Sequence, residues 1–574
     1  MRPARIAIPR LRRCFHRFIA AMRGNVAIIF ALALIPLLAF VGLAIDYSRA
    51  NSLKAAMQTA LDSTALMISK TAANLSATQI QDTAKSYFLA EFNHPEAKNI
   101  QFTASYSTSG GSQVVVTASA DMNTDFLSVI GDKQLTITAA STAKWGSSRL
   151  RVALVLDTTG SMADDGKLTA LQTATKNLLT QLQNAASVNG DVYVSIIPFA
   201  KNVNVGASNY NANWIDWTDW AAEPAILDPA RGGANPSNWS QITGGSTCPF
   251  TNTSQGFTCT SGPANGSSSV STIPSSGSYA GYICPSKDSG NKIANKVGIY
   301  YNGCYNSVAT TTTTTTTVCT GRNCTCGTLS NCTCTGSGSS KVCKQTTTTT
   351  GAPYTHTWIA NAHSTWNGCV VDRGSYSGPI SDYDRLVTAP TTSITATLFP
   401  AEQNYYCPPA MMGLSYNWTS MSSQVATLTA QGATNQPIGL VWGWQSLVGG
   451  GPLSAPAKDP NYTYTDVIIL LSDGLNTLDR WYGNGSATNT SVDTRMYDST
   501  GKGTCANINA AGITLYTIQV DTGGDPTSTL LKNCAGSPGK FPDSDKFFLL
   551  TSADQIITTF NAIGTNLTKL RIAK

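Results

Sequence analysis

The chain has 574 residues, too many for one hydrophobic core, so two to four structural units are expected. Only 12% of its residues are charged and four are His, which leaves little material for a His-rich metal site. The first 25 residues contain seven of the 38 Lys and Arg, all seven of them Arg, and no acidic residue. The rest of the chain has 31 basic and 32 acidic residues, so the net charge of +6 comes from the N-terminal tail. By charge, the body of the protein is not a nucleic-acid binder.

A membrane-spanning helix is predicted directly after this basic tail. Residues 26–45 carry no charge, and a helix of 20 residues reaches about 30 Å, the thickness of a bilayer core. The preceding arginines place the N-terminus in the cytoplasm, so the chain after Asp46 is exported. A cleaved signal peptide is the alternative, but the apolar run is longer than a signal requires and no clear small-residue cleavage site follows. We therefore expect a retained single-pass anchor.

A small α+β stalk is predicted between the membrane and residue 148. Residues 46–93 lack Gly and place apolar residues at helical spacing, which predicts one or two helices that continue out of the membrane. Residues 99–144 alternate apolar and polar side chains, with Gly110 and Gly111 as a turn. This pattern predicts strands that follow the helices.

From Arg149 onward, strands and helices alternate. The expected strands are RLRVALVLD, DVYVSIIPFA, DVIILLSDG and ITLYTIQV. The expected helices are GKLTALQTATKNLLTQLQNAA, QVATLTAQG, GLVWGWQSL, CANINAAG and a C-terminal helix from Ala553. Alternation of this kind predicts the α/β class, with a doubly wound, mostly parallel, Rossmann-like sheet that has helices on both faces.

The cysteines agree with export. Cys14 alone precedes the membrane segment, and fourteen follow it, an even number. Twelve of these lie between Cys248 and Cys407, and the last two are Cys505 and Cys534. Paired cysteines in an oxidising compartment indicate disulfides.

The alternation stops in an insertion at about 201–420, where two Thr runs, 310–317 and 346–350, flank six cysteines. Thr favours strands, so we expect the runs to pair antiparallel, with Thr312 opposite Thr350, in an arm with disulfides at its tip. The nested cysteine pairs of this hypothesis are Cys319 with Cys343, Cys324 with Cys334, and Cys326 with Cys332. Low-complexity disorder and a thiolate metal site are the alternatives.

Oxygen-bearing side chains gather where two predicted strands end. Asp157 ends the first strand, and Thr159 and Ser161 follow at alternate positions, so the three side chains point the same way. Asp473 ends another strand, and the carboxyl ends of strands form the ligand-binding edge of an open α/β sheet. Such donors suit Mg²⁺ first, with Mn²⁺ or Ca²⁺ as alternatives, rather than zinc. The same residue types also cap helices and form turns, which is the structural alternative.

This pattern resembles a von Willebrand factor type A domain, whose metal-ion-dependent adhesion site has the form D-x-S-x-S with a distant Thr and a distant Asp. Thr434, in GATNQPIGL, matches the distant Thr. The resemblance implies a metal held by Asp157, Thr159, Ser161, Thr434 and Asp473, with a carboxylate of a protein ligand completing the shell. Thr159 stands where the family usually has Ser, so the hydroxyl is kept and a methyl group is added.

The segment RGNVAIIFALALIPLLAFVGLAIDYSRA is similar to the N-terminal segment of TadE/TadG-like proteins of bacterial tight-adherence (Flp) pilus systems. TadG-like proteins join this segment to an exported A domain, and GLVWGWQSL and the pair Cys505 and Cys534 also resemble that group. A disulfide between these two cysteines closes a loop of 30 residues. Some relatives are processed after a Gly such as Gly24, but no Glu lies at the fifth position after it, so we expect an intact anchor.

These resemblances imply a non-enzymatic bacterial inner-membrane protein, N-terminus cytoplasmic and bulk periplasmic or further exported. It assembles or anchors a Flp pilus through metal-dependent contact with pilus or secretion-system proteins. A surface adhesin that binds host or substratum is the alternative. A metal-dependent hydrolase is disfavoured, because no catalytic motif surrounds the histidines. The expected parts are a tail (1–25), a transmembrane helix (26–45), a stalk (46–148) and an A domain (149–574) with its insertion.

Overall fold

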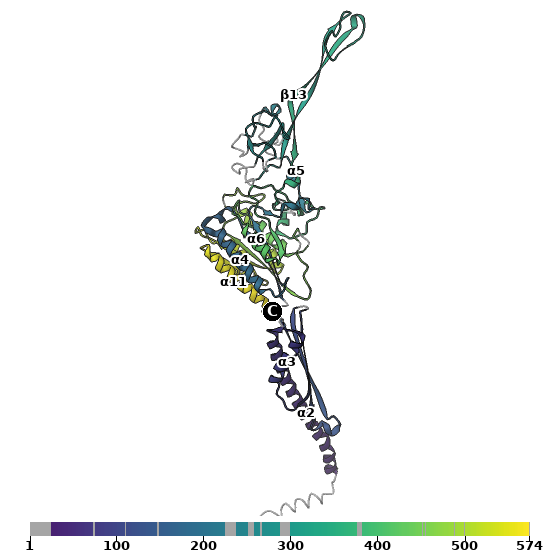
Figure 1. Cartoon of the computed structure of the whole chain (residues 1–574), viewed down its shortest axis with the longest axis vertical. Helices are drawn as coiled ribbons and strands as arrows, with labels where there is room; N and C mark the ends of the chain where they lie inside the picture. Colours follow the sequence, from purple (N-terminus) through teal and green to yellow (C-terminus); the bar gives the residue numbers. More distant parts are fainter. Residues whose placement is uncertain are drawn as a thin grey trace, which may run out of the picture. The chain divides into compact units, whose positions relative to one another are not determined.

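The computed structural model describes residues 25–572 apart from 73–74, 109–110, 146–147, 224–236, 251–257, 264–266, 287–298, 376–380, 450–451, 454, 487 and 499. The chain divides into two compact units (Figure 1). The first contains residues up to 148 together with 460–463, and the second contains residues 149–459 and 464–573. The protein is of the mixed α/β type, with an N-terminal apolar helix and some parallel strands.

The first unit begins with one continuous helix, α2 (Asn25–Ser69), which contains Pro36. Among the described helices, α2 alone is long and apolar enough to cross a membrane, judged by length and composition. Its side chains between residues 29 and 41 are all exposed, whereas from Leu53 onward one side of the helix is buried. The helix therefore has an uncovered apolar part, compatible with a single-pass anchor, and a packed part.

The packed part of α2 lies against a second helix and a three-stranded sheet. α3 (Ala77–Glu91) begins with a capping box, in which Ser76 and Gln79 satisfy each other's backbone N–H groups. The sheet is antiparallel in the order β1-β2-β3. Its strands are β1 (Ala97–Ser107), β2 (Ser112–Asn123) and β3 (Gln134–Trp145). Apolar residues from both helices and one face of the sheet, among them Met57 and Phe88, form the core.

The second unit contains a larger sheet in the order β14-β6-β5-β4-β17-β18-β19, with β16 also paired to β5. The pairs β4/β5, β17/β18 and β18/β19 are parallel. The strands are β4 (Ser148–Asp157), β5 (Val192–Phe199), β17 (Thr463–Ser472), β18 (Thr514–Val520), β19 (Phe547–Leu550), β6 (Val203–Asn204), β14 (Cys369–Val370) and β16 (Met412–Ser415). β19 and the short antiparallel strands β6, β14 and β16 were not predicted, because segments this short carry no periodic signal.

Both faces of this sheet are buried. Alternate residues of β4 point to opposite sides, so that Leu154 joins one apolar core and Val155 the other. The first core includes α4 (Lys167–Ala185), α6 (Trp418–Ala426) and α11 (Asp554–Ile572). The second includes α7 (Gln436–Leu447), α8 (Thr490–Met496), α9 (Thr504–Ala510) and α10 (Thr529–Cys534). α6 ends at Ala426, earlier than the predicted QVATLTAQG helix.

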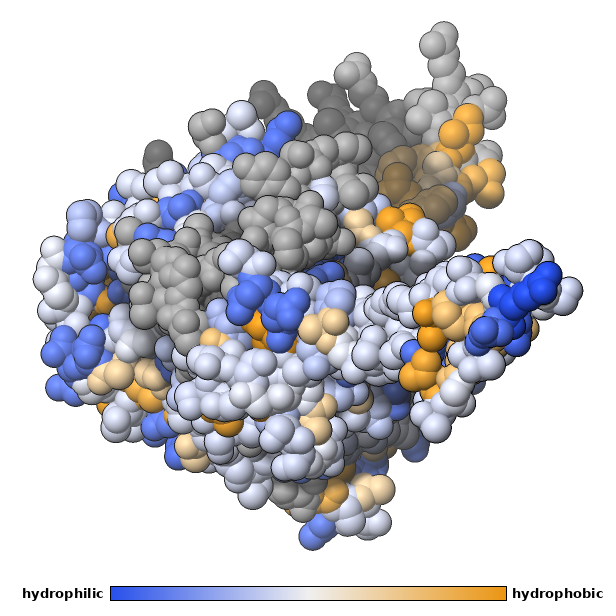
Figure 2. Space-filling model, turned by 90° about the horizontal axis from the view of Figure 1, so that it is seen from above, coloured by the Kyte–Doolittle hydropathy of each residue, from blue (hydrophilic) through white to orange (hydrophobic). Residues whose placement is uncertain are grey.

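The Thr runs lie in two long paired strands, β11 (Gly303–Thr320) and β13 (Val342–Ala360), drawn as a ribbon in Figure 1. The antiparallel pairing was predicted, but the predicted register is wrong by one residue: Thr311, not Thr312, faces Thr350. The cause is an irregularity between Thr317 and Cys319, since Cys319 does face Cys343 as predicted. In the face shown in Figure 2, pale, weakly polar residues prevail, and the orange groups are small and separate apart from a longer orange run at the upper right.

All fourteen cysteines after the apolar segment of α2 form disulfides. The bonds are Cys248–Cys259, Cys284–Cys304, Cys319–Cys324, Cys326–Cys332, Cys334–Cys343, Cys369–Cys407 and Cys505–Cys534. The predicted pairs Cys326–Cys332 and Cys505–Cys534 are present, but Cys319–Cys343 and Cys324–Cys334 are wrong. The reason is β12 (Cys332–Thr335), which folds back beside β13 and places Cys334 opposite Cys343. At the far end of the β11–β13 ribbon, the sulfur atoms of Cys319, Cys324 and Cys343 lie within 4.8 Å of one another, and so do those of Cys326, Cys334 and Cys343. All of these cysteines are in disulfides, so none is a free thiolate.

Candidate functional site

The candidate site begins where β4 ends. Asp157 is fully buried, and its carboxylate Oδ1 accepts a hydrogen bond of 2.8 Å from the backbone N–H of Thr159. The chain then turns, so that the hydroxyls of Thr159 and Ser161 lie 3.2 Å apart. The local turn therefore brings one carboxylate and two hydroxyl groups to the carboxyl end of β4.

The end of β17 supplies the second carboxylate. The hydroxyl of Ser161 donates to Asp473 Oδ1 at 2.8 Å, across 312 positions of sequence. Asp473 Oδ2 accepts a hydrogen bond of 2.6 Å from the ammonium group of Lys167, and both side chains are buried. Both oxygens of Asp473 thus have partners within the protein.

Thr434 lies beside this pair, in the loop that precedes α7. Its backbone N–H donates to the hydroxyl of Thr477 at 2.9 Å. A Cβ atom placed on Gly474 would lie 3.7 Å from Ser161 Oγ and 3.8 Å from Thr434 Oγ1, so the absence of a side chain at this position leaves space between the two hydroxyls. The structure therefore brings the five predicted residues together from three segments of the chain.

Ionisation of the buried Asp157 carboxyl is unfavourable without a cation. Burial, and secondarily the charge of Asp473, raise the pKa of Asp157 to about 7. Ser472 opposes this shift, since its hydroxyl donates to Asp157 Oδ2 at 2.5 Å. Two carboxylates and the single ammonium of Lys167 leave the site with a formal charge of −1. Oxygen donors, buried negative charge and the space beside Gly474 fit a hard divalent cation.

Sequence reasoning missed Lys167 and Ser472. Lys167 opens α4 and reads as an ordinary surface residue at the start of an amphipathic helix. Ser472 is the residue before Asp473, and in the sequence it is only one more position of an apolar strand. No local signal distinguishes either residue, because both acquire their role from a partner more than 300 positions away.

Segments of the insertion hold the Thr434 loop in place. Asn435 is fully buried, and its side-chain amide donates to the carbonyl oxygen of Lys201 at 3.0 Å and to Asp372 Oδ2 at 2.9 Å. The ammonium group of Lys201 in turn bonds Glu402 Oε1 at 2.7 Å. The insertion is thus attached to the site through buried polar contacts.

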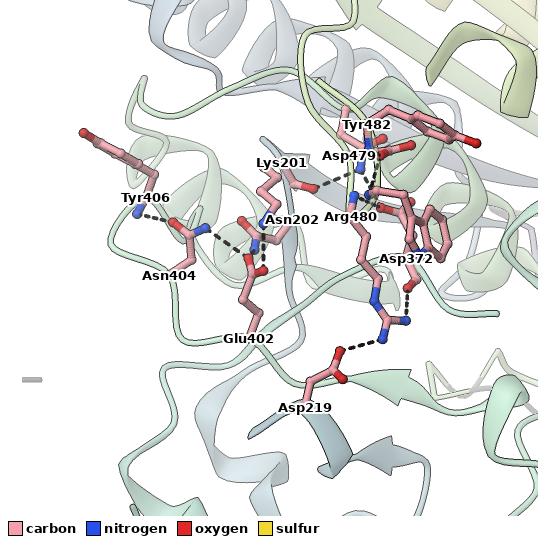
Figure 3. A network of polar contacts seen from close by, with 12 residues as sticks. Lys201, Asn202, Asp219, Asp372, Glu402, Asn404, Tyr406, Asp479, Arg480 and Tyr482 are labelled. Carbon is pink, nitrogen blue, oxygen red and sulfur yellow. Dashed lines mark hydrogen bonds and ion pairs between the residues drawn. The ribbon is translucent and has the colours of Figure 1, made fainter. Parts of the chain in front are cut away.

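The loop after β17 joins the same network. Arg480 donates to the carbonyl oxygen of Asp372 at 3.0 Å and to Asp219 Oδ2 at 2.6 Å (Figure 3). Asp479 is buried, which raises its pKa to about 6, and the charge of Asp372 adds to this shift. Burial likewise raises the pKa of Asp384 to about 7, although it contacts Arg495. Buried ionisable groups therefore link the insertion to both loops that carry Thr434 and Asp473.

Residues 24–68 match the protein family described as putative Flp pilus-assembly TadE/G-like. The N-terminal segment, which contains an apolar helix, is therefore similar to TadE/G-like pilus-assembly segments. No curated protein matches the sequence.

Among solved structures, the SpaC pilus adhesin of Lactobacillus rhamnosus GG is similar, with 13% identity over 83% of this chain and 36% of that chain (TM-score 0.28). A variant of the PilB minor pilin of Streptococcus sanguinis is 10% identical over 82% of this chain and 80% of that chain (TM-score 0.27). The chain spans about a third of the length of SpaC. At these TM-scores neither likeness carries an argument.

Proposed function

We propose that this chain is a membrane-anchored envelope protein of a Flp pilus system that binds a protein partner through a divalent cation in a von Willebrand A-type domain. It acts by binding and not by catalysis. The observation that carries the proposal is the convergence of five oxygen-bearing side chains at one end of the sheet, where the hydroxyls of Ser161 and Thr434 lie beside the glycine at position 474.

The topology of the larger sheet supports the A-type assignment. From β4 the chain proceeds through α4 to β5 on one side, while β17, β18 and β19 follow in order on the other side. The order of strands therefore reverses between β4 and β17, and ligands of open α/β sheets bind at such a point. Asp157 and Asp473 end the two strands that flank it.

The charges of the site indicate the kind of partner. A divalent cation would change the formal charge of the site from −1 to +1, because Lys167 already offsets one carboxylate. Asp157, Ser161 and Thr434 would hold the cation, whereas Asp473 contributes mainly charge, since it already forms an ion pair with the ammonium group of Lys167. The cation supplies a positive centre that can accept one more oxygen ligand. An acidic side chain of the partner fits this requirement, and the neighbouring insertion would choose among partners.

A surface adhesin is the second candidate. It is favoured by the ribbon of β11 and β13, whose Thr side chains are largely exposed and offer hydroxyl groups to a polar surface. Proteolysis of intact cells separates the two functions: an adhesin is trimmed, whereas a periplasmic assembly protein is protected.

The test of the proposed function uses the full chain in detergent, two matched variants of Thr434, and Asp157→Asn. Thr434→Ser keeps the hydroxyl group, whereas Thr434→Val keeps the shape and removes it. Calorimetric titration with Mg²⁺, Mn²⁺ or Ca²⁺ should give binding for wild type and Thr434→Ser, at least about tenfold weaker binding for Thr434→Val, and none for Asp157→Asn. Crosslinking in cells should lose the same partner in the last two variants. Absence of cation binding by the wild type would refute the proposal.

A further inference from the structure

A loop of the first unit covers the only two buried positions among residues 29–49 of α2. Between residues 29 and 49 of α2, every described side chain is exposed except at Gly42 and Asp46, one helical turn apart. The segment that covers them is the loop between β2 and β3, residues 125–130, which contains the short helix η2 (Leu127–Ile130). We refer to residues 125–130 as the tip loop.

Asp46 fixes the tip loop to the helix. Its carboxylate accepts three consecutive backbone N–H groups, those of Asp125 at 3.1 Å, Phe126 at 2.9 Å and Leu127 at 2.8 Å. Arg49 also forms an ion pair with Asp125. One carboxylate that satisfies three amides determines both the position and the orientation of the loop.

The apolar end of the tip loop is directed toward the membrane-spanning part of α2. In order along α2 toward its N-terminus, Arg49 contacts Asp125, Asp46 contacts the loop amides, and Gly42 contacts Phe126. The loop therefore changes from polar to apolar toward the N-terminus of α2, as the helix itself does. A Cβ atom on Gly42 would lie 2.6 Å from Phe126 Cβ, so only Gly allows the aromatic side chain to approach this closely.

The level of this contact can be placed along the helix. The uncharged segment ends at Ile45, and Gly42 lies three residues before it, about 4.5 Å inside the apolar segment at the helical rise. Phe126 is nevertheless 46% exposed and Val129 is 83% exposed. Two apolar side chains of the tip loop thus stand uncovered at a level of α2 where the side chains of the helix are themselves apolar and exposed, among them Phe40 at 71%.

We propose that the tip loop is a second membrane contact, which inserts Phe126 and Val129 into the outer boundary of the bilayer beside α2. This inference rests on the proposed membrane anchor. A single helix is free to rotate and to change its depth, and the loop fixes both because it is attached to one side of the helix at a defined height. The first unit is then a stalk with a set orientation on the membrane.

The experiment places a small fluorescent amino acid, one position at a time, in the full chain reconstituted in phosphatidylethanolamine and phosphatidylglycerol vesicles. The positions are Phe126, Val129, Phe40 as a probe of the helix, and Leu89 in α3 as a control. Leu89 is 44% exposed, which matches Phe126, and circular dichroism of each labelled protein checks that the fold is intact. Quenching is measured with lipids brominated near the headgroup or near the chain end.

The expected result is quenching at Phe126 and Val129 at least threefold above Leu89, and stronger with the shallow bromines. Quenching at Phe40 with no excess at the loop positions would overturn the loop contact and leave the anchor standing. No quenching at Phe40 would overturn the membrane anchor and, with it, the proposed loop contact. Asp46→Ala should reduce quenching at Val129, since the loop loses its attachment; unchanged quenching would refute the role of this carboxylate.

Discussion

Replacing Asp157 by Asn tests the electrostatics of the candidate site most directly. The substitution keeps the shape of the side chain and removes its charge. In the absence of a cation, the buried Asp157 carboxyl has its pKa raised from 3.8 to about 7. At about 1.4 kcal/mol per pKa unit, holding this group ionised above pH 7 costs the folded state about 4 kcal/mol.

The sign of the pH dependence follows from this shift. Between about pH 4 and pH 7 the folded site retains a proton that the unfolded chain has lost, so the free energy of unfolding falls as the pH rises through this window. In chelator, Asp157→Asn should therefore be more stable than wild type at pH 8, by up to about 4 kcal/mol, and similar to it at pH 4. Asp384 and Asp479 add a dependence of the same sign, which cancels in the comparison between the two proteins.

Tryptophan fluorescence during urea unfolding is a suitable assay, because ten of the eleven Trp lie in the second unit. Mg²⁺ at about a hundredfold excess over its dissociation constant should add about 2.7 kcal/mol to the wild type and nothing to Asp157→Asn. Parallel pH profiles in chelator would refute the argument from burial, and equal stabilisation of both proteins by Mg²⁺ would refute the role of Asp157 as a ligand.

Three further predictions concern stability. Lys167→Met leaves a buried carboxylate without its cation and should lower the free energy of unfolding in chelator by about 3–5 kcal/mol, with a larger rescue by Mg²⁺ than in wild type; an unchanged denaturation midpoint would contradict the ion pair. Cys534→Ser opens the disulfide with Cys505 and should cost about 3–4 kcal/mol in chemical denaturation, whereas no loss would show that the bond is not formed. Gly443→Ala places a methyl group 2.4 Å from the side chain of a β4 valine and should cost about 1–3 kcal/mol, while Gly449→Ala, with no atom within 4 Å, is the neutral control in the same melting assay.

The elements that position the site were predictable because their signals are local. β4 and β17 are apolar runs that lead into a carboxylate, so periodicity and strand ends were sufficient to select Asp157, Thr159, Ser161 and Asp473, whereas Thr434 was selected only through the resemblance to A domains. Their assignment to a cation remains a prediction. The apolar helix was equally accessible, since its length and lack of charge are properties of composition alone.

The sequence by itself determined where oxygen donors, the apolar helix segment and an even set of cysteines after it occur. Only the tertiary structure decided which groups meet: that Lys167 neutralises Asp473, that Asn435 is held by Asp372 of the insertion, and that Cys343 bonds Cys334 rather than Cys319. The physical reason is that a local pattern fixes the direction of a side chain, whereas a partner hundreds of positions away, or a strand that folds back on a neighbour, is chosen by packing and register of the whole sheet.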